Sequence, residues 1–386
     1  MTGISESDWE NAALDILSEP LLWQPIAGEK IAPGSGERET WDELLIRPRL
    51  LDAMRRLNPD VPVSYLQQAI AEIAAPKSLD AITENHRIHD YLTGGYPLTY
   101  IDDNGIEQSP RIRVLGTEPE QNDWLAVNQV TIRQGDRHRR FDIVLYVNGM
   151  PLSIIELKKA GSASTGVAPA HAQLQTYLRE FPTAFRFCVF TLASDGIDAK
   201  YGTPFTPLNH FAPWNVDDDG NRLSQPRIDD GVDVVPLDDA LNGLYNQERF
   251  LQLVRNYTAF DEGSNGLVKR IAKPHQYFAV TKAVGSTIQA VETNGKAGVV
   301  WHTQGSGKSM EMELYVNLVT RQPKLKNPTV IVVTDRNELD GQLFQTFKRS
   351  LLLADHPVQV KERAQLREEL SQRVTGGIYF TTLQKF

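Results

Sequence analysis

The residues best suited to chemistry lie between positions 141 and 177. Asp142 stands in the apolar run 141–147, which predicts a β-strand, and Asn148-Gly149 then predicts a tight hairpin. Glu156 and Lys158 lie on the return strand, where side chains two apart point to the same face. The hairpin is expected to bring Asp142 beside them. Two carboxylates offer Mg²⁺ hard oxygen ligands, and an ammonium can stabilise charge growing on a phosphate.

This segment resembles the PD-(D/E)xK nucleases, whose core runs strand, strand, strand, helix, strand. The resemblance assigns catalysis to Asp142, Glu156 and Lys158, and it implies Mg²⁺ bound by the two carboxylates with the carbonyl of Leu157 as an extra ligand. Phe141 stands where the family often has proline, a common departure. The candidate elements follow the family's order, at residues 124–132, 140–147, 152–158, 168–180 and 186–192.

Gln173 and Tyr177 are four residues apart and share one face of the predicted helix. They match the Gln-x-x-x-Tyr motif of the nuclease branch found in helicase–nucleases and restriction motor subunits. Both are counted as catalytic residues that orient DNA or Lys158, because neutral side chains are poor Mg²⁺ ligands. A carboxylate and a lysine two apart are also common on solvated strand edges, but the apolar return strand and this pair favour the nuclease.

A second chemical signal is the glycine-rich segment at 302–309. Residues 299–301 predict an apolar strand before it, and residues 310–319 predict a helix after it. The backbone N–H groups of such a loop cradle the phosphates of ATP. Lys308 is expected to reach the β- and γ-phosphates, and Ser309 to ligate Mg²⁺. The expected nucleotide-binding residues of this loop are Thr303, Gln304, Gly305, Ser306, Gly307, Lys308 and Ser309.

The surroundings of this loop resemble superfamily 2 helicases and translocases, which tolerate His302 in place of the first glycine. Arg270 and Gln276 resemble the adenine-reading Q motif, with Gln276 as the base reader. Residues 328–334 predict a buried strand that ends at Asp335-Arg336, like a motif that contacts the DNA backbone. Residues 377–386 resemble the next strand with its threonine-bearing DNA contact.

No Walker B acid follows the loop in a suitable place, since Glu338 and Asp340 stand at the start of a predicted helix. The chain is therefore expected to be the N-terminal piece of a larger motor, truncated before Walker B. By itself it is expected to lack meaningful ATPase activity, because phosphoryl transfer needs several positioned groups at once.

The amino-acid composition excludes several classes of protein and of binding site. The 386 residues carry 40 basic and 49 acidic side chains, a net charge of −9, so DNA contacts must come from local patches. Residues 133–140 form one basic cluster, either a phosphate contact or a solvated turn. The single cysteine, Cys188, excludes a disulfide framework or an iron–sulfur cluster, and the eight histidines show no zinc spacing. No apolar run is long enough for a membrane span, and a cytoplasmic location is expected.

Two domains are expected, an endonuclease domain at 1–255 and a first RecA-like domain at 256–386. Ser5 to Asp8 predict a capped helix start, and Glu10 is either the acid of the nuclease family's opening helix or a surface residue. Further helices are expected at 40–57, 64–74, 85–92 and 237–253, loops and short strands at 193–236, and a linker at 261–266.

A nuclease core followed by a superfamily 2 motor resembles the R (restriction and translocation) subunit of type I restriction enzymes. The fold implied is α/β: a mixed sheet flanked by helices, followed by a partial RecA-like domain with a parallel sheet. The function implied is double-stranded DNA cleavage after ATP-driven translocation, with Mg²⁺ and ATP as cofactors and modification (methyltransferase) and specificity subunits as partners. Two alternatives are a RecB-like repair helicase–nuclease, which usually has the reverse order, and a scaffold that binds DNA and partners without turnover.

Overall fold

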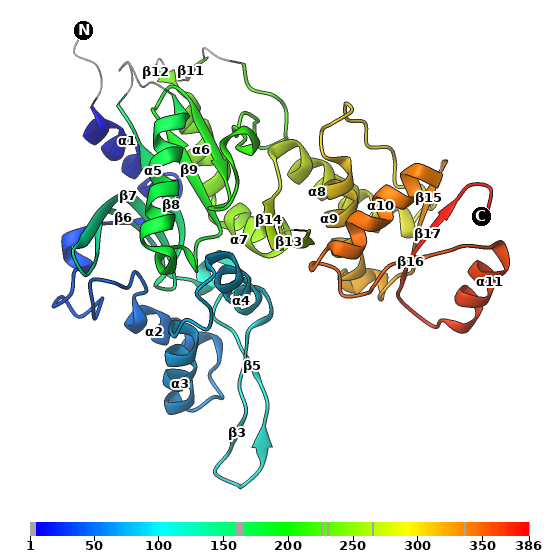
Figure 1. Ribbon diagram of the computed structural model, residues 1–386, viewed down its shortest axis with the longest axis horizontal. Helices are drawn as coiled ribbons and strands as arrows, with labels where there is room; N and C mark the ends of the chain where they lie inside the picture. The colour runs from blue at the N-terminus through cyan, green and yellow to red at the C-terminus, as the bar shows by residue number, and fades with distance from the viewer. Residues whose placement is uncertain are drawn as a thin grey trace. The chain divides into compact units, whose positions relative to one another are not determined.

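The computed structural model divides into two compact units between Arg255 and Asn256 (Figure 1). Arg336 and Phe386, which the sequence analysis placed in DNA-contact motifs, lie outside the described residues, as do the side chains of Glu338 and Asp340. The structure describes residues 5–159, 166–224, 227–229, 232–264, 266–335 and 337–385.

The first unit is built on a six-stranded mixed sheet. Its strand order is β1-β6-β7-β8-β9-β10. β1 pairs parallel with β6 and β8 pairs parallel with β9, whereas the other neighbours are antiparallel. The expectation of a mixed sheet with helices is confirmed. The strands are β1 (Gln24–Ala27), β6 (Trp124–Gln134), β7 (Arg137–Val147), β8 (Met150–Leu157), β9 (Phe190–Ser194) and β10 (Ala199–Gly202).

The predicted hairpin joins β7 to β8. Asn148 and Gly149 both have positive φ, 54° and 76°, as a two-residue turn of the primed type requires. Gly149 has a second constraint, since a Cβ there would lie 2.3 Å from the carbonyl oxygen of Ile46. The turn pairs Val147 with Met150 and Tyr146 with Pro151, and an irregularity between Leu145 and Tyr146 then shifts the register by one residue, so that Ile143 pairs with Ile155. The turn and this irregularity together determine which side chains of the two strands meet.

Helix α5 (Val167–Glu180) packs against β8 and β9. Its apolar face joins strand residues in one buried cluster, and Leu174, Tyr177 and Phe141 belong to it. Val144, Ile154 and Ala193 contribute from three neighbouring strands. Burial of this apolar area is the main force that holds the helix on the sheet.

The remaining helices of the first unit differ from expectation at two points. The helix expected at 40–57 begins only at Arg47, because the backbone N–H of Ile46 donates to the carbonyl of Gly149 and Ile46, with φ of −99° and ψ of 87°, lies outside the helical region. The helix expected at 237–253 is two helices, broken at Asn246, whose side chain accepts from the N–H of Arg249. These helices are α1 (Glu6–Ser18), α2 (Arg47–Leu57), α3 (Val63–Ala74), α4 (Ala81–Gly94), α6 (Pro236–Tyr245) and α7 (Gln247–Asn256).

Short strands complete the first unit, in the three pairs β2–β5, β3–β4 and β11–β12. The expected loops and short strands after β9 are confirmed. The strand expected to begin at Arg186 starts only at Phe190, because residues 185–188 form a turn whose carbonyls accept from the side chain of Asn85. The strands are β2 (Tyr96–Pro97), β3 (Tyr100–Ile101), β4 (Glu107–Gln108), β5 (Arg111–Ile112), β11 (Arg227–Asp229) and β12 (Val232–Val234).

The second unit carries a three-stranded parallel sheet of order β15-β17-β16. The segment expected to be a linker is instead the turn of an antiparallel hairpin, β13 with β14, whose strands pair along their full length. Its elements are β13 (Thr258–Gly263), β14 (Gly266–Ile271), α8 (Pro274–Val291), α9 (Lys308–Thr320), β15 (Val330–Thr334), α10 (Asn337–Arg349), β16 (Val358–Gln359), α11 (Arg363–Gln372) and β17 (Ile378–Thr382).

The strand expected immediately before the phosphate loop is not formed. Val299 is 90% exposed and Trp301 is 88% exposed. In the described part of the chain no strand pairs with residues 299–301, so their backbone lacks the ladder that would make them a strand. The buried strand expected at 328–334 is only partly buried, with Val333 42% exposed, because β15 forms an edge of its sheet. Within the described residues, no helix combines the length and apolar character needed to cross a membrane.

Candidate functional site

Asp142, Glu156 and Lys158 meet at the end of β8. Oδ2 of Asp142 accepts a hydrogen bond of 2.8 Å from the backbone N–H of Leu157. Nζ of Lys158 donates to Oε1 of Glu156 at 2.6 Å and to the carbonyl oxygen of Leu157 at 2.9 Å. The structure thus brings together all three residues assigned to catalysis and the backbone group assigned as an extra metal ligand.

Burial dominates the electrostatics of this cluster. It raises the pKa of Glu156 well above the usual carboxyl range, and the charge of Asp142 raises it further, against the opposing effect of Lys158. Burial also raises the pKa of Asp142, although the hydrogen bond from Leu157 lowers it. For Lys158, burial lowers the pKa, but the charge of Glu156 and its hydrogen bond outweigh this effect and leave the pKa raised.

Helix α1 contributes acids that the sequence analysis left open or missed. Glu10 is buried, and the side-chain amide of Gln129 donates to its carboxylate oxygens at 2.6 and 2.5 Å. Burial raises the pKa of Glu10, and the charge of Asp142 raises it further. Oε1 of Glu6 lies 4.0 Å from Nζ of Lys158. Residues 6 and 10 are one helical turn apart, so the capped helix start that the sequence shows could have predicted that both acids share a face.

The backbone of β6 is irregular at Gln129. Asn128 pairs with Ile143 and Val130 with Phe141, so Gln129 lies opposite Asp142 without a change of register, but its φ of 55° interrupts the ladder at this position. A side chain with positive φ is uncommon outside glycine, and such backbone strain concentrates at functional sites. No local sequence signal predicts this conformation of Gln129, because it depends on how β6 pairs with β7.

Gln173 and Tyr177 contact each other on α5. The hydroxyl of Tyr177 donates to the carbonyl oxygen of Arg140 at 3.2 Å, and its ring packs edge-on against Phe141, centroids 4.9 Å apart. Burial raises the pKa of Tyr177, and the nearby charge of Glu156 raises it further. The pair therefore anchors α5 to the strand that carries Asp142, beside the acids.

The donor set fits Mg²⁺. Asp142, Glu156 and Glu10 supply hard carboxylate oxygens, the kind of ligand that Mg²⁺ selects. Oε2 of Glu156 is buried and receives no hydrogen bond from any residue that the structure describes. A buried acceptor without a donor is costly, and a cation would satisfy it. Burial raises the pKa values of Asp142 and Glu156, and a bound cation would favour their charged forms.

The basic cluster at 133–140 lies at the connected ends of β6 and β7 rather than in a long loop. Two of its arginines have protein partners: Arg139 forms a 2.8 Å ion pair with Glu180, and Arg133 stacks over Trp41 at 4.4 Å. Arg137 and His138 are exposed. Part of the cluster thus stabilises the fold, and the exposed part is open to solvent and to phosphates.

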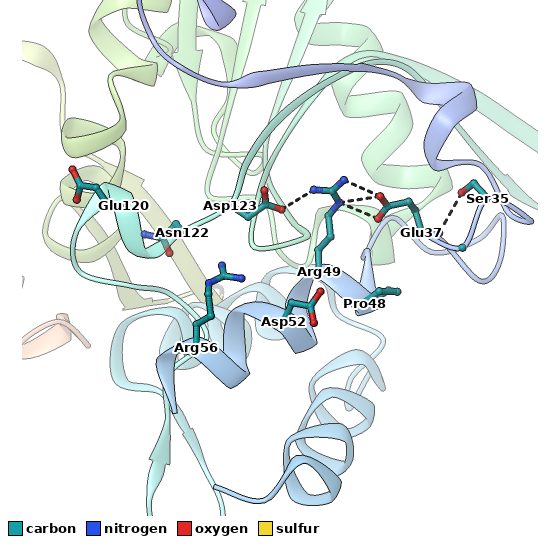
Figure 2. Close-up of a pocket in the computed structure, with 10 residues that line it drawn as sticks. Ser35, Glu37, Pro48, Arg49, Asp52, Arg56, Glu120, Asn122 and Asp123 are labelled. Atoms are coloured by element: carbon teal, nitrogen blue, oxygen red, sulfur yellow. Dashed lines mark hydrogen bonds and ion pairs between the residues drawn. The ribbon is translucent and has the colours of Figure 1, made fainter. Parts of the chain in front are cut away.

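A pocket of about 620 Å³ in the first unit contains none of the predicted site residues. Figure 2 shows the guanidinium of Arg49 between the carboxylates of Asp123 and Glu37. The distances are 2.9 Å to Asp123 and 2.8 Å to Glu37. Because both acids neutralise its charge, Arg49 ties α2 to the start of β6.

In the second unit, the phosphate loop leads directly into α9. Gly305 and Gly307 have φ of 82° and 88°, a conformation that favours glycine. Nζ of Lys308 donates to the carbonyl oxygens of His302 and Thr303 at 3.0 and 2.8 Å. The lysine expected to bind phosphate is thus folded back on its own loop, and Ser309 is exposed beside it. Thr303, Gln304 and Gly305 are exposed, and Ser306 is partly buried.

Gln276 is buried, with 3% of its surface exposed. Its Oε1 accepts from the backbone N–H of Lys273, and its Nε2 donates to the carbonyl of Gly307 at 3.2 Å. In this conformation the expected base reader ties the start of α8 to the phosphate loop. Arg270, the other residue of the predicted Q motif, forms ion pairs with Asp261 and Glu313.

Two family models match this chain. Residues 3–210 match the family described as type I restriction enzyme R protein N terminus, and residues 275–386 match SWI2/SNF2 ATPase. The first covers the mixed sheet with Asp142, Glu156 and Lys158. The second covers the phosphate loop and the parallel sheet. This agrees with an α/β nuclease fold followed by a RecA-like part.

Curated relatives support the same assignment. The chain is 37% identical over 99% of its length to the type I restriction enzyme HindI endonuclease subunit of Haemophilus influenzae, and spans 36% of that protein. It is 28% identical over 98% of its length to the putative MjaIXP endonuclease subunit of Methanocaldococcus jannaschii, and spans 37% of it. The identity extends through both units, from the nuclease-like sheet to the phosphate loop, and the chain accordingly belongs to the family of type I restriction enzyme R proteins.

Proposed function

We propose that the first unit is the Mg²⁺-dependent endonuclease centre of a type I restriction enzyme and cleaves double-stranded DNA. The observation that carries this proposal is the convergence of Asp142, Glu156 and Lys158 at the end of β8, with a buried Glu156 oxygen that lacks a donor. Asp142, Glu156 and the carbonyl of Leu157 would hold the metal. Bound there, Mg²⁺ would act as a Lewis acid toward a phosphate oxygen of the DNA backbone.

The side chains around the metal position have distinct tasks in this proposal. The ammonium of Lys158 is partly exposed and held by Glu156, so it can turn toward a phosphate and offset developing negative charge. Gln173 and Tyr177 fix α5 against the strand of Asp142 and orient DNA at the site's edge. Glu10, held by Gln129, would add a third carboxylate near Asp142.

The second unit would bind ATP and drive DNA translocation. Lys308 would leave the carbonyls of His302 and Thr303 for the β- and γ-phosphates, Ser309 would ligate Mg²⁺, and the N–H groups from Thr303 to Gly307 would cradle the phosphates. Gln276 would recognise adenine. The partners proposed for the whole subunit are modification and specificity subunits, with target recognition left to the latter.

The test is Asp142→Ala in the full-length subunit assembled with its modification and specificity partners. Double-strand cleavage of a plasmid carrying the target site should be abolished, while DNA-stimulated ATP hydrolysis stays at the wild-type rate. The matched control is Asp103→Ala, which removes an exposed carboxylate from the turn between β3 and β4. Cleavage by Asp142→Ala at the wild-type rate would disprove the assignment, and loss of both activities would point to a structural role for Asp142.

A further inference from the structure

Two histidines and a glutamate meet beside the phosphate loop. His275 lies in the first turn of α8, His302 precedes the glycine-rich loop, and Glu311 lies in the first turn of α9. One ligand atom from each lies within 4.8 Å of the other two. Nδ1 of His302 is 2.7 Å from Oε1 of Glu311, and Nε2 of His275 is 3.8 Å from the same oxygen. The histidine rings pack edge-on, with centroids 5.2 Å apart.

This spacing is close to that of metal ligands. Zn²⁺ takes imidazole nitrogens and carboxylate oxygens at about 2.0–2.2 Å, which places ligand atoms about 3.4 Å apart in a tetrahedral site. The two measured separations, 2.7 and 3.8 Å, bracket that value. Small rotations of the partly exposed histidine rings would equalise them. Glu311 is 7% exposed, so its oxygen is already oriented and largely desolvated.

We propose that His275, His302 and Glu311 form a binding site for a divalent transition metal of the Zn²⁺ type. Two imidazoles and one carboxylate favour such a metal over Mg²⁺, which prefers oxygen ligands alone. Water would complete the tetrahedron. The site is separate from the oxygen-rich cluster of Asp142 and Glu156, which belongs to the other unit.

Metal at this site would join the start of α8 to the phosphate loop and the first turn of α9. Without metal, these segments are joined by hydrogen bonds, which are weaker than metal coordination. His302 is hydrogen-bonded to Glu311, and Nε2 of His275 lies 2.9 Å from the carbonyl oxygen of Ser306. Coordination would replace both hydrogen bonds and release the Ser306 carbonyl within the phosphate loop. Since the unfolded chain does not preassemble the three ligands, bound metal also stabilises the folded second unit.

The experiment measures Zn²⁺ binding to the metal-stripped 386-residue chain by competition with a chromogenic chelator. Mg²⁺ in large excess is present throughout to occupy the carboxylate cluster of the first unit. We expect a Zn²⁺ equivalent in the wild type whose affinity falls at least tenfold in His302→Ala and in His275→Ala. His210→Ala, which removes an exposed histidine of the first unit, should bind Zn²⁺ as the wild type does.

A second measurement distinguishes loss of Zn²⁺ binding from misfolding of a variant. Glu311→Gln keeps the size and hydrogen-bonding capacity of the side chain but loses the anionic ligand. We expect this variant to have a wild-type circular dichroism spectrum and no Zn²⁺-dependent rise in the unfolding temperature of the second unit, whereas the wild type shows that rise. Wild-type chain that binds no Zn²⁺ under excess Mg²⁺, or Zn²⁺ affinity unchanged in all three cluster variants, would overturn the proposal.

Discussion

The backbone N–H of Leu157 donates a 2.8 Å hydrogen bond to Oδ2 of Asp142 and so fixes a carboxylate of β7 at the end of β8. This bond spans a hairpin whose register is determined by the positive-φ turn at Asn148 and Gly149 together with the register shift between Leu145 and Tyr146. The same strand end carries Glu156 and the carbonyl of Leu157. The geometry of the acidic cluster is therefore a property of the hairpin backbone, which is stiffer than any of the side chains it presents.

Glu156→Gln is expected to stabilise the metal-free protein at pH 8 while abolishing cleavage. The pKa of Glu156 is raised in the folded state, so above the ordinary carboxyl value of about 4.3 the unfolded state gives up its proton first. The free energy of unfolding therefore falls as pH rises from about 4.3 to the raised pKa of the folded state. Above that pKa the buried charge of Glu156 destabilises the protein to its full extent. The amide of glutamine carries no charge and avoids this cost.

Urea unfolding with EDTA at pH 4 and pH 8 tests this expectation. The free energy of unfolding of the variant should exceed that of the wild type at pH 8, and the two should converge at pH 4. Asp103→Asn, at an exposed carboxylate, is the matched control and should change little at either pH. Equal stabilities at pH 8 would contradict a buried, destabilising charge at Glu156.

Tyr177→Phe should slow cleavage modestly and leave metal affinity unchanged. The change removes the hydroxyl that donates to the Arg140 carbonyl but keeps the ring that packs on Phe141. A neutral hydrogen bond is worth about 1 kcal/mol, which corresponds to roughly a fivefold loss of rate. Single-turnover cleavage by the assembled enzyme, measured across a Mg²⁺ titration, separates the two effects. A large rise in the Mg²⁺ concentration needed for half-maximal rate would show that Tyr177 acts on the metal.

Lys308→Ala should weaken ATP binding by the second unit by roughly 10- to 100-fold. A hydrogen bond to a charged group is worth about 1.5–3 kcal/mol, and Lys308 is expected to form one with the phosphates. The lysine's present partners, the carbonyls of His302 and Thr303, are exposed and can turn to water when it leaves. Binding of a fluorescent ATP analogue measures the loss, with the exposed Lys324→Ala as control. Equal affinity in wild type and Lys308→Ala would remove the lysine from the nucleotide site.

The sequence predicts elements where local chemistry decides the structure. The hairpin at Asn148-Gly149 and the spacing of Glu156 and Lys158 follow from turn and strand periodicity alone. The positive φ of Gln129 and its hydrogen bond to Glu10 depend instead on the packing of β6 against β7 and α1, which a single sequence does not encode locally. The association of His275 with His302, 27 positions later, likewise arises only when α8 and α9 pack.

Two predictions were wrong because backbone pairing in the folded protein, and not the local sequence pattern, determined the structure. Residues 299–301 are apolar and β-branched or aromatic, but without a pairing strand in the described chain they remain exposed and irregular. Residues 261–266 contain the glycines and polar residues typical of a linker, and the same residue types form hairpin turns. The backbone pairing of β13 with β14 decides between these interpretations, and sequence composition does not.

Arg270→Ala should destabilise the second unit by about 3–5 kcal/mol, because it leaves Glu313 as a buried charge without its cation. The guanidinium lies 2.5 Å from Asp261 and 2.7 Å from Glu313, and Glu313 is fully buried. The arginine thus joins the β13–β14 hairpin to α9, the helix that follows the phosphate loop. Burial raises the pKa of Glu313 and the charge of Arg270 lowers it, so removal of the arginine favours the protonated acid.

The double variant Arg270→Ala/Glu313→Gln separates this charge effect from simple loss of packing. It should recover a large part of the lost stability, because glutamine can still accept from the hydroxyl of Ser350 and carries no charge. Thermal unfolding of the second unit, compared among wild type, single and double variants, provides the measurement. If the double variant is no more stable than Arg270→Ala alone, the uncompensated charge of Glu313 is not the cause, and the aliphatic stem of Arg270 is what holds the hairpin on the helix.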